Sequence, residues 1–316
     1  MGRLMAELVH KMEKGGRKLI KWLQKKRLLA PKMKCPACKH HMKMAKSGST
    51  RLGYRWRCRR SCHGDISRTI KKGSVFEGSH MDLSTWLKIM HNFAQGLRKR
   101  HVDMIEEGVI GSSASITKVY DTLRHCCVTA IQRLKKRKKM RIGGRHSFVV
   151  IDESKFCHKR KYNRGRFGRA WRRQRTWVFG LLEVRAARRR PVLKLVKSRS
   201  RRHLLPIIQK YVRTGSQILS DSWRAYNTLQ QQGYIHYQVN HRRFFVHPQS
   251  GAHTQHMERA WRSYKENIYR YRGNLTEHSL QKNLCLIEWN YWLGKNHRHG
   301  PIGRLLHDIK KVYKLK

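Results

Sequence analysis

The sequence has little negative charge: 18 Asp and Glu residues stand against 73 Lys and Arg residues in 316, for a formal net charge of +55. It has no apolar run long enough to predict a transmembrane helix. The N-terminal residues lack the apolar core of a secretory signal peptide, and Ala6 stands where a myristoylation signal needs Ser or Thr. Membrane-spanning and lipid-anchored proteins are therefore not expected.

Without a secretory signal, the eight cysteines do not predict a disulfide framework, and a reducing compartment with a metal site fits them better. Hydrophobic residues make up 39% of the chain, which is low for a globular protein. The 9 Trp, 12 Tyr and 8 Phe residues are nevertheless spread over the whole length. The sequence therefore predicts folded domains rather than a disordered chain.

The excess of positive charge predicts a polyanionic partner. The sequence pI of about 11.1 is in the range of nucleic-acid-binding domains. Each Lys or Arg placed against a phosphate releases counterions, so binding should weaken strongly as salt rises. An anionic membrane is a weaker alternative, because the charge covers the full length and is not confined to one amphipathic segment.

The N-terminal part has helical and hairpin patterns in turn. Apolar residues at helical spacing predict two helices within 1–32, broken at Gly15-Gly16. Region 33–78 is rich in Cys and Gly and predicts small β-hairpins. Region 79–132 predicts a helix, a short helix over 100–107, a turn and a longer helix, which is typical of a helix-turn-helix DNA-binding domain. Three packed helices that contact no DNA would show the same periodicity.

Four cysteines in the hairpin region come in two close pairs, CPAC and CRRSC. These residues are Cys35, Cys38, Cys58 and Cys62. Two thiolate pairs at this separation are typical of a tetrahedral structural zinc site in a ribbon of hairpins. The second pair has three intervening residues where two are usual, so His40, His41 or His63 could replace one ligand. Unrelated thiols are the alternative, and the other four cysteines are expected to be packing residues.

The basic run 133–145 ends in Gly-Gly and predicts a linker, with a solvated segment, a DNA-backbone contact or a nuclear import signal as alternatives. From residue 146 the patterns predict three strands, a helix, a strand, a helix, a strand and a helix: 147–152, 176–184, 192–197, 202–213, 217–220, 222–232, 235–239 and 253–270. This order is that of a ribonuclease-H-like α/β catalytic domain, 146–275, followed by a helical C-terminal tail, 276–316. The expected fold class is thus α+β with several domains.

Three acidic residues occupy related places in this domain. Asp152 ends the first predicted strand, Asp221 ends the fourth, and Glu258 lies on the last helix, one turn from the sheet. In the ribonuclease-H-like order the first and fourth strands are neighbours, so the three carboxylates would converge. Two divalent ions can activate the nucleophile and stabilise the leaving oxygen in phosphodiester cleavage. Carboxylates suit Mg²⁺ or Mn²⁺, whereas Cys and His would favour zinc.

Each acid taken alone has a simpler interpretation. Asp221 could cap a helix, and Glu258 could pair with a neighbouring arginine. Glu153 is a second choice for the site, because it points to the other face if the strand continues. Trp223 and Trp261 are expected to belong to the core. The joint order of the three acids is what favours an active site.

These motifs together resemble Merlin-type DNA transposases, which are related to a group of bacterial insertion-sequence transposases. The resemblance covers roughly residues 33–310 and rests on the ribbon together with IDESKF...KRKYNRGR, WVFG, ILSDSWRAY, the stretch from VNH to HTQHMERAW, and IEWNYWLG. It implies that Asp152, Asp221 and Glu258 are the catalytic triad and that the chain is catalytically competent. The CxxxC spacing departs from the family pattern.

The resemblance implies a cut-and-paste mechanism on double-stranded DNA. A homodimer or larger assembly would bind terminal inverted repeats, hydrolyse the element ends and transfer the 3′-hydroxyl into target DNA. Basic residues after the first strand would contact phosphates near the cleavage point, with a solvated loop as the alternative: Lys155, Lys159, Lys161, Arg164 and Arg166. The implied location is the nucleus in a eukaryotic host and the cytoplasmic nucleoid in a bacterial one.

Two other functions share parts of this pattern. A zinc-ribbon DNA-binding regulator with an inactive nuclease-like domain would use the charge and the ribbon, but would not need all three acids. A structure-selective nuclease, such as a junction resolvase, would use the fold and the metals without a repeat-reading module. An assay with a pre-cleaved repeat end distinguishes a transposase from a nuclease, since only a transposase transfers that end to a second DNA.

Overall fold

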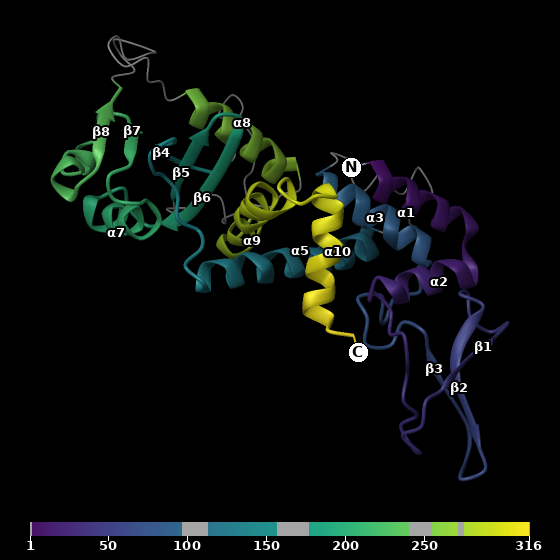
Figure 1. Ribbon diagram of the computed structural model, residues 1–316. Helices are drawn as coiled ribbons and strands as arrows, with labels where there is room; N and C mark the ends of the chain where they lie inside the picture. The colour runs from purple at the N-terminus through teal and green to yellow at the C-terminus, as the bar shows by residue number, and fades with distance from the viewer. Residues whose placement is uncertain (1, 97–112, 157–176, 240–254, 271–274, 316) are drawn as a thin grey trace, which may run out of the picture. The chain divides into compact units, whose positions relative to one another are not determined.

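The computed structural model describes residues 2–96, 113–156, 177–239, 255–270 and 275–315. The chain forms two compact units, one comprising Met1–Thr129 with Gly294–Lys316 and the other Ala130–Leu293 (Figure 1). Over the described ranges, none of the helices combines the length and the apolar character that a membrane span requires.

The first unit begins with two helices, α1 (Gly2–Lys14) and α2 (Gly16–Lys25). They are separated where the sequence predicts a break, because Gly15 adopts a positive φ of 51° that side chains disfavour. The helices contact each other, and each presents buried leucines at helical spacing. These leucines are Leu4, Leu8, Leu19 and Leu23.

A three-stranded antiparallel sheet follows, with strands β1 (Lys43–Lys46), β2 (Tyr54–Arg60) and β3 (His63–Thr69) in the order β1-β2-β3. The hairpins predicted for this region are therefore confirmed. The turn between β2 and β3 is short, and the pairing register shifts between Cys58 and Arg60.

Three further helices belong wholly or partly to the first unit: α3 (Leu83–Gln95), α5 (Ser113–Lys136) and α10 (Gly300–Tyr313). Helix α10 packs against α3, although the two are far apart in the sequence. The short helix predicted over 100–107 lies outside the described residues, so the helix-turn-helix stays a prediction.

The basic run 133–145 does not form a solvated linker over its whole length. Its first four residues belong to α5, and the Lys135 ammonium lies 2.6 Å from the buried Glu288 carboxylate. Met140 and Ile142 are buried, and Ile142 forms a parallel β-bridge with Val212. The prediction counted the charges and overlooked these apolar residues, which attach the segment to the second unit.

The second unit is built on a five-stranded mixed sheet. Its strands are β4 (Phe148–Ser154), β5 (Trp177–Arg185), β6 (Arg188–Val196), β7 (Gln217–Ser220) and β8 (Ile235–Gln238). They lie in the order β6-β5-β4-β7-β8, in which β4, β5 and β6 are antiparallel while β7 is parallel to β4 and to β8. The prediction that the first and fourth strands are neighbours is confirmed.

Helices cover this sheet: α7 (Arg201–Tyr211), α8 (Gln255–Arg270) and α9 (Glu277–Trp289) (Figure 1). Tyr211 of α7 lies under Lys194 of β6, whereas α8 and α9 pack with Val150 and Leu182 in one apolar cluster. Because side chains alternate along a strand, even-numbered residues of β4 face α8 and odd-numbered residues face the other side.

The helix predicted over 222–232 is wrong. Two 3₁₀ turns, Arg224–Tyr226 and Gln230–Gln232, stand in its place, and Gly233 closes the second with a φ of 79°. The buried Tyr226 and Leu229 satisfy helical spacing, but a 3₁₀ turn places residues three apart on one side equally well.

Candidate metal centre and candidate active site

Three cysteines and one histidine of the first unit come together around one point. Their ligand atoms all lie within 4.8 Å of one another. The residues are Cys35, Cys38, Cys58 and His63. Among the residues that the structure describes, this is the one such group of three or more Cys, His, Asp or Glu side chains.

The separations between these atoms match the edges of a zinc tetrahedron. His63 Nε2 lies 3.4 Å from Cys35 Sγ, 3.1 Å from Cys38 Sγ and 3.5 Å from Cys58 Sγ, and the Cys38 and Cys58 sulfurs are 3.7 Å apart. Zn–S bonds of about 2.3 Å and Zn–N bonds of about 2.0 Å give tetrahedral S···S edges of about 3.8 Å and S···N edges of about 3.5 Å. The donor set and its geometry therefore fit zinc.

Hydrogen bonds orient and polarise this cluster. His63 Nδ1 donates to the Gly64 carbonyl at 2.7 Å, which leaves Nε2 facing the sulfurs and raises the pKa of the ring. Burial works to raise the pKa of the Cys38 thiol, but hydrogen bonds from the His40 backbone and from His63 outweigh it and lower the pKa to about 5. A thiolate is the form that binds a metal.

Cys62 is not part of the cluster, and this corrects the predicted ligand set. Its side chain is exposed in the turn between β2 and β3, whereas His63 begins β3 and pairs with Arg60. The histidine side chain takes the fourth corner, one of the replacements that the unusual spacing left open.

Two of the three predicted acids, Asp152 and Asp221, lie at one edge of the sheet of the second unit, which we call the carboxylate edge. The parallel pairing of β4 and β7 aligns Val150 with Leu219. Asp152 comes two residues after Val150 within β4, and Asp221 comes two residues after Leu219, just beyond the end of β7. Both side chains are therefore carried to the same edge of the sheet. Strand β4 continues to Ser154, so Asp152 lies within the strand and not at its end as predicted.

Protein groups hold both aspartates. Asp152 Oδ2 accepts a hydrogen bond of 2.8 Å from Trp261 Nε1, and its Oδ1 accepts one of 2.8 Å from the Glu153 backbone N–H. Asp221 Oδ1 accepts one of 3.1 Å from the Trp223 backbone N–H. Trp261 is buried as predicted, but its contact with Asp152 was not predicted. These bonds orient the two carboxylates.

Helix α8 carries Glu258 in its first turn, and it approaches the sheet closely beside Asp152. Gly180 pairs with Asp152 across the ladder, and a Cβ at this position would collide with Met257 and lie 2.6 Å from the Trp261 ring. Glycine is thus required for the close packing of α8. A glycine inside a strand pattern, as in WVFG, is the signal that could have predicted it.

Glu153 points to the other face of β4, as expected for a strand. It is buried, and its Oε1 accepts a hydrogen bond of 2.6 Å from the Tyr226 hydroxyl. Burial, helped by the charges of Asp152 and Asp221, raises the pKa of Glu153 to about 7, while the Tyr226 bond and Arg199 oppose the rise. The bond ties β4 to the segment that follows Asp221.

The three carboxylates are not brought to the close spacing of the Cys–His cluster among the described residues. Asp152 and Asp221 share an edge, and the exposed Glu258 lies in the first turn of α8. Of the predicted phosphate contacts, Lys155 is exposed just beyond β4, with its ammonium 4.7 Å from the centre of the Trp177 ring. The other four, Lys159, Lys161, Arg164 and Arg166, lie outside the described residues.

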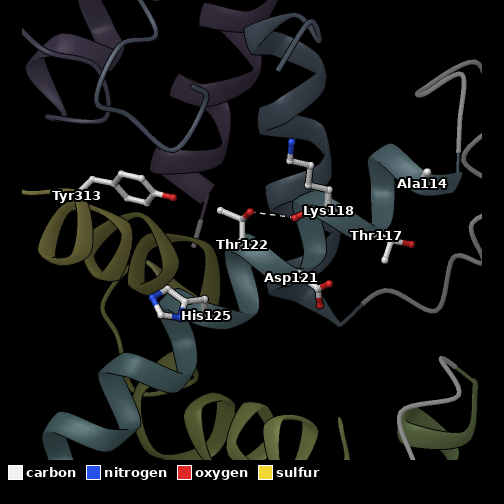
Figure 2. A pocket seen from close by; sticks show the side chains of 7 residues that line it. All are labelled: Ala114, Thr117, Lys118, Asp121, Thr122, His125 and Tyr313. Carbon is white, nitrogen blue, oxygen red and sulfur yellow. Dashed lines mark hydrogen bonds between the residues drawn. The ribbon is translucent and has the colours of Figure 1, made fainter. Parts of the chain in front are cut away.

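An open pocket of the first unit lies apart in the sequence from these carboxylates. It has a volume of about 660 Å³ and is lined by one side of α5 together with Tyr313. Figure 2 shows Asp121 and His125 on this side of the helix, and Thr122, whose hydroxyl donates to the Lys118 carbonyl at 2.9 Å. With one short acid and one imidazole on an open surface, the pocket offers no equivalent of the carboxylate edge.

Comparison with known proteins places the second unit in a family. The model of the ISXO2-like transposase domain matches residues 127–289, just over half of the chain. Searches of curated proteins and of solved structures return no match. The matched range includes all three predicted acids, the strands and helix that carry them, and Gly180. The chain belongs to the ISXO2-like transposase family.

Proposed function

We propose that this protein is a cut-and-paste DNA transposase of the Merlin type, with a ribonuclease-H-like catalytic domain in its second unit. The observation that carries the proposal is the parallel pairing of β4 and β7, which brings Asp152 within β4 and Asp221 just after β7 to the same end of neighbouring strands. The family match gives the reaction class. The predicted division into ribbon, helix-turn-helix, catalytic domain and tail, the nuclear location and the dimeric state are parts of the same proposal.

Asp152, Asp221 and Glu258 would hold divalent cations, Mg²⁺ or Mn²⁺. Their donor set is all carboxylate oxygen, which suits these hard cations and disfavours zinc. Bound ions would activate the attacking hydroxyl and stabilise the charge on the leaving oxygen. The chain's own part is to position the acids, through Trp261 at Asp152 and the Trp223 backbone at Asp221.

The charge of the chain supports DNA as the substrate. A net charge of +55 favours a polyanion as partner. In so basic a chain, two aspartates at one edge of the sheet are consistent with a site that binds divalent cations. The Cys–His cluster supports a ribbon that reads terminal repeats, because a bound zinc would make short hairpins rigid enough to dock on DNA.

Strand transfer tests the proposal. A labelled, pre-cleaved terminal-repeat duplex is incubated with plasmid, Mg²⁺ and the full chain, in parallel with Asp221→Asn. Joined product is expected from the wild type, and its rate should fall about a thousandfold in the variant, since metal-assisted charge stabilisation contributes several kcal/mol.

Glu13→Gln is the matched control, because it removes the same charge from an exposed site on α1, outside the predicted DNA-binding and catalytic segments. It should join strands at the wild-type rate. Repeat binding without metal-dependent product would instead favour a DNA-binding regulator. Plasmid nicking without joining would favour a nuclease.

A further inference from the structure

Two tryptophans and an arginine from three separate segments meet at the end of the sheet in the second unit. Trp177 begins β5, Arg199 follows β6, and Trp223 follows β7. The Arg199 guanidinium carbon lies 4.4 Å from the centre of each indole ring. The Trp223 indole N–H donates to the Arg199 carbonyl at 2.8 Å. We call these three residues the Trp–Arg cluster.

The Trp–Arg cluster adjoins the carboxylate edge. Trp223 is two residues beyond Asp221, and its backbone N–H donates to the Asp221 carboxylate. Lys155, three residues beyond Asp152, places its ammonium 4.7 Å from the centre of the Trp177 ring. A strand whose phosphate lies at the two aspartates would therefore present its neighbouring nucleotides to this cluster.

Trp223 is too exposed to be explained by packing. Its relative exposure is 37%, whereas Trp261 on the other side of the carboxylate edge has 5%. The core position predicted for Trp223 is therefore wrong. Its ring is nevertheless fixed, by the indole hydrogen bond at one edge and by the Arg199 guanidinium. A fixed, exposed aromatic ring in cationic surroundings is the kind of surface on which nucleobases stack.

The state of the DNA follows from the same chemistry. Inside a duplex each base is covered by its neighbours above and below and has no free face for an indole. A base that is unpaired at a strand end, or turned out of the helix, has such a face. We propose that the Trp–Arg cluster stacks an unpaired nucleobase next to the phosphate held at the carboxylate edge. The location beside a reacting phosphate rests on the proposed function.

Binding of a short single-stranded oligonucleotide tests this directly. The full chain is titrated against a fluorescein-labelled strand of mixed sequence and against the same strand made of abasic residues, which keeps the phosphates and removes the bases. Salt is raised until phosphate contacts alone bind weakly. The wild type should bind the base-bearing strand more tightly than the abasic strand. In Trp223→Ala the ratio of these two affinities should fall about tenfold, a typical effect of removing one stacking ring.

Trp223→Phe should keep most of the preference, because it retains a ring. Ile235→Ala is the control, since Ile235 is similarly exposed, at 48%, in the same unit. Equal binding of base-bearing and abasic strands by the wild type would overturn the proposal without any variant. An unchanged preference in a folded Trp223→Ala protein, checked by its urea midpoint, would overturn it as well.

The outcome can be separated from that of the strand-transfer assay. Base preference that depends on Trp223, in a protein that joins no strands, would support the stacking site and remove the transposase proposal. Joined product from a wild type that shows no base preference would remove the stacking site and leave the transposase proposal standing.

Discussion

The metal centre of the first unit and the carboxylate edge of the second are assembled in different ways. In the first, sulfur and nitrogen atoms from two nearby hairpins already lie at the separations of a tetrahedron. In the second, the acids come from segments far apart in the sequence, and Asp152 and Asp221 are each held by separate hydrogen bonds.

The difference follows from what holds each group of ligands. Thiol and imidazole groups can lie close together without repulsion, and His63 Nε2 lies within 3.5 Å of three cysteine sulfurs. Ionised carboxylates repel at short distance and need an opposite charge between them. The ribbon site is thus defined by local turn geometry, and the carboxylate edge by sheet topology and by the approach of α8.

The largest effect should come from removing a ligand of the metal centre. Cys35→Ser should release zinc and unfold the ribbon, because a structural zinc contributes roughly 10 kcal/mol to the folding of a small hairpin domain. Zinc content measured by mass spectrometry and near-ultraviolet circular dichroism would report the loss.

Cys62→Ser is the matched control, since Cys62 is exposed beside the cluster. It should retain zinc, whereas His63→Ala should lose it. Zinc that survives in His63→Ala and disappears in Cys62→Ser would restore the ligand set first predicted from the cysteine spacing.

The second effect concerns Glu153, on the face of β4 opposite Asp152. Burial raises its pKa from 4.5 to about 7, so the folded protein binds more protons than the unfolded chain between these values. Stability should therefore fall as pH rises through that window, by at most about 3 kcal/mol, and level off above pH 7. Glu153→Gln should remove this pH dependence in urea unfolding without added Mg²⁺, and should be the more stable protein at pH 8.

In the first unit, Glu77 should give stability the opposite dependence on pH. Glu77 hydrogen-bonds to Lys72 and to the Gly73 backbone, and these contacts lower its pKa. Glu77→Gln should therefore cost stability at neutral pH, and the cost should fade in acid. A Glu153→Gln protein that behaves in this way would show that the buried carboxyl is ionised.

The sequence predicted the topology of the second unit better than its details. Short apolar runs predicted the central strands, and an aspartate near the end of two of them predicted the position of the site. Both signals can be seen in the order of residues along the chain, without knowledge of the packing. His63, not Cys62, is the fourth candidate zinc ligand because the short turn between β2 and β3 points the Cys62 side chain outward. The spacing of the cysteines in the sequence does not reveal this. The exposed ring of Trp223 and the bond from Trp261 to Asp152 depend on packing between distant segments.

A third, smaller effect should follow when the approach of α8 to the sheet is blocked. Gly180→Ala would place a methyl group against Met257 and Trp261, and such overpacking costs about 1–3 kcal/mol. Because Glu258 lies on the same helix, α8, the rate of strand transfer should fall by more than the loss of stability explains. Gly64→Ala, where a Cβ meets nothing within 4 Å, should leave zinc content and unfolding midpoint unchanged.

The smallest effect separates positioning from packing at the carboxylate edge. Trp261→Phe keeps a ring against Phe156 and Tyr264 but removes the N–H that donates to Asp152. Loss of a hydrogen-bonding partner behind a metal ligand typically costs about tenfold in metal affinity or activity. The variant should need about tenfold more Mg²⁺ for half-maximal strand transfer, with nearly unchanged thermal stability.

The corresponding bond at the metal centre, from His63 to the Gly64 carbonyl, uses a backbone oxygen that no substitution removes. A Trp261→Phe protein that loses stability but keeps its Mg²⁺ requirement would mean that the indole only fills space, and that the Glu153 backbone N–H orients Asp152.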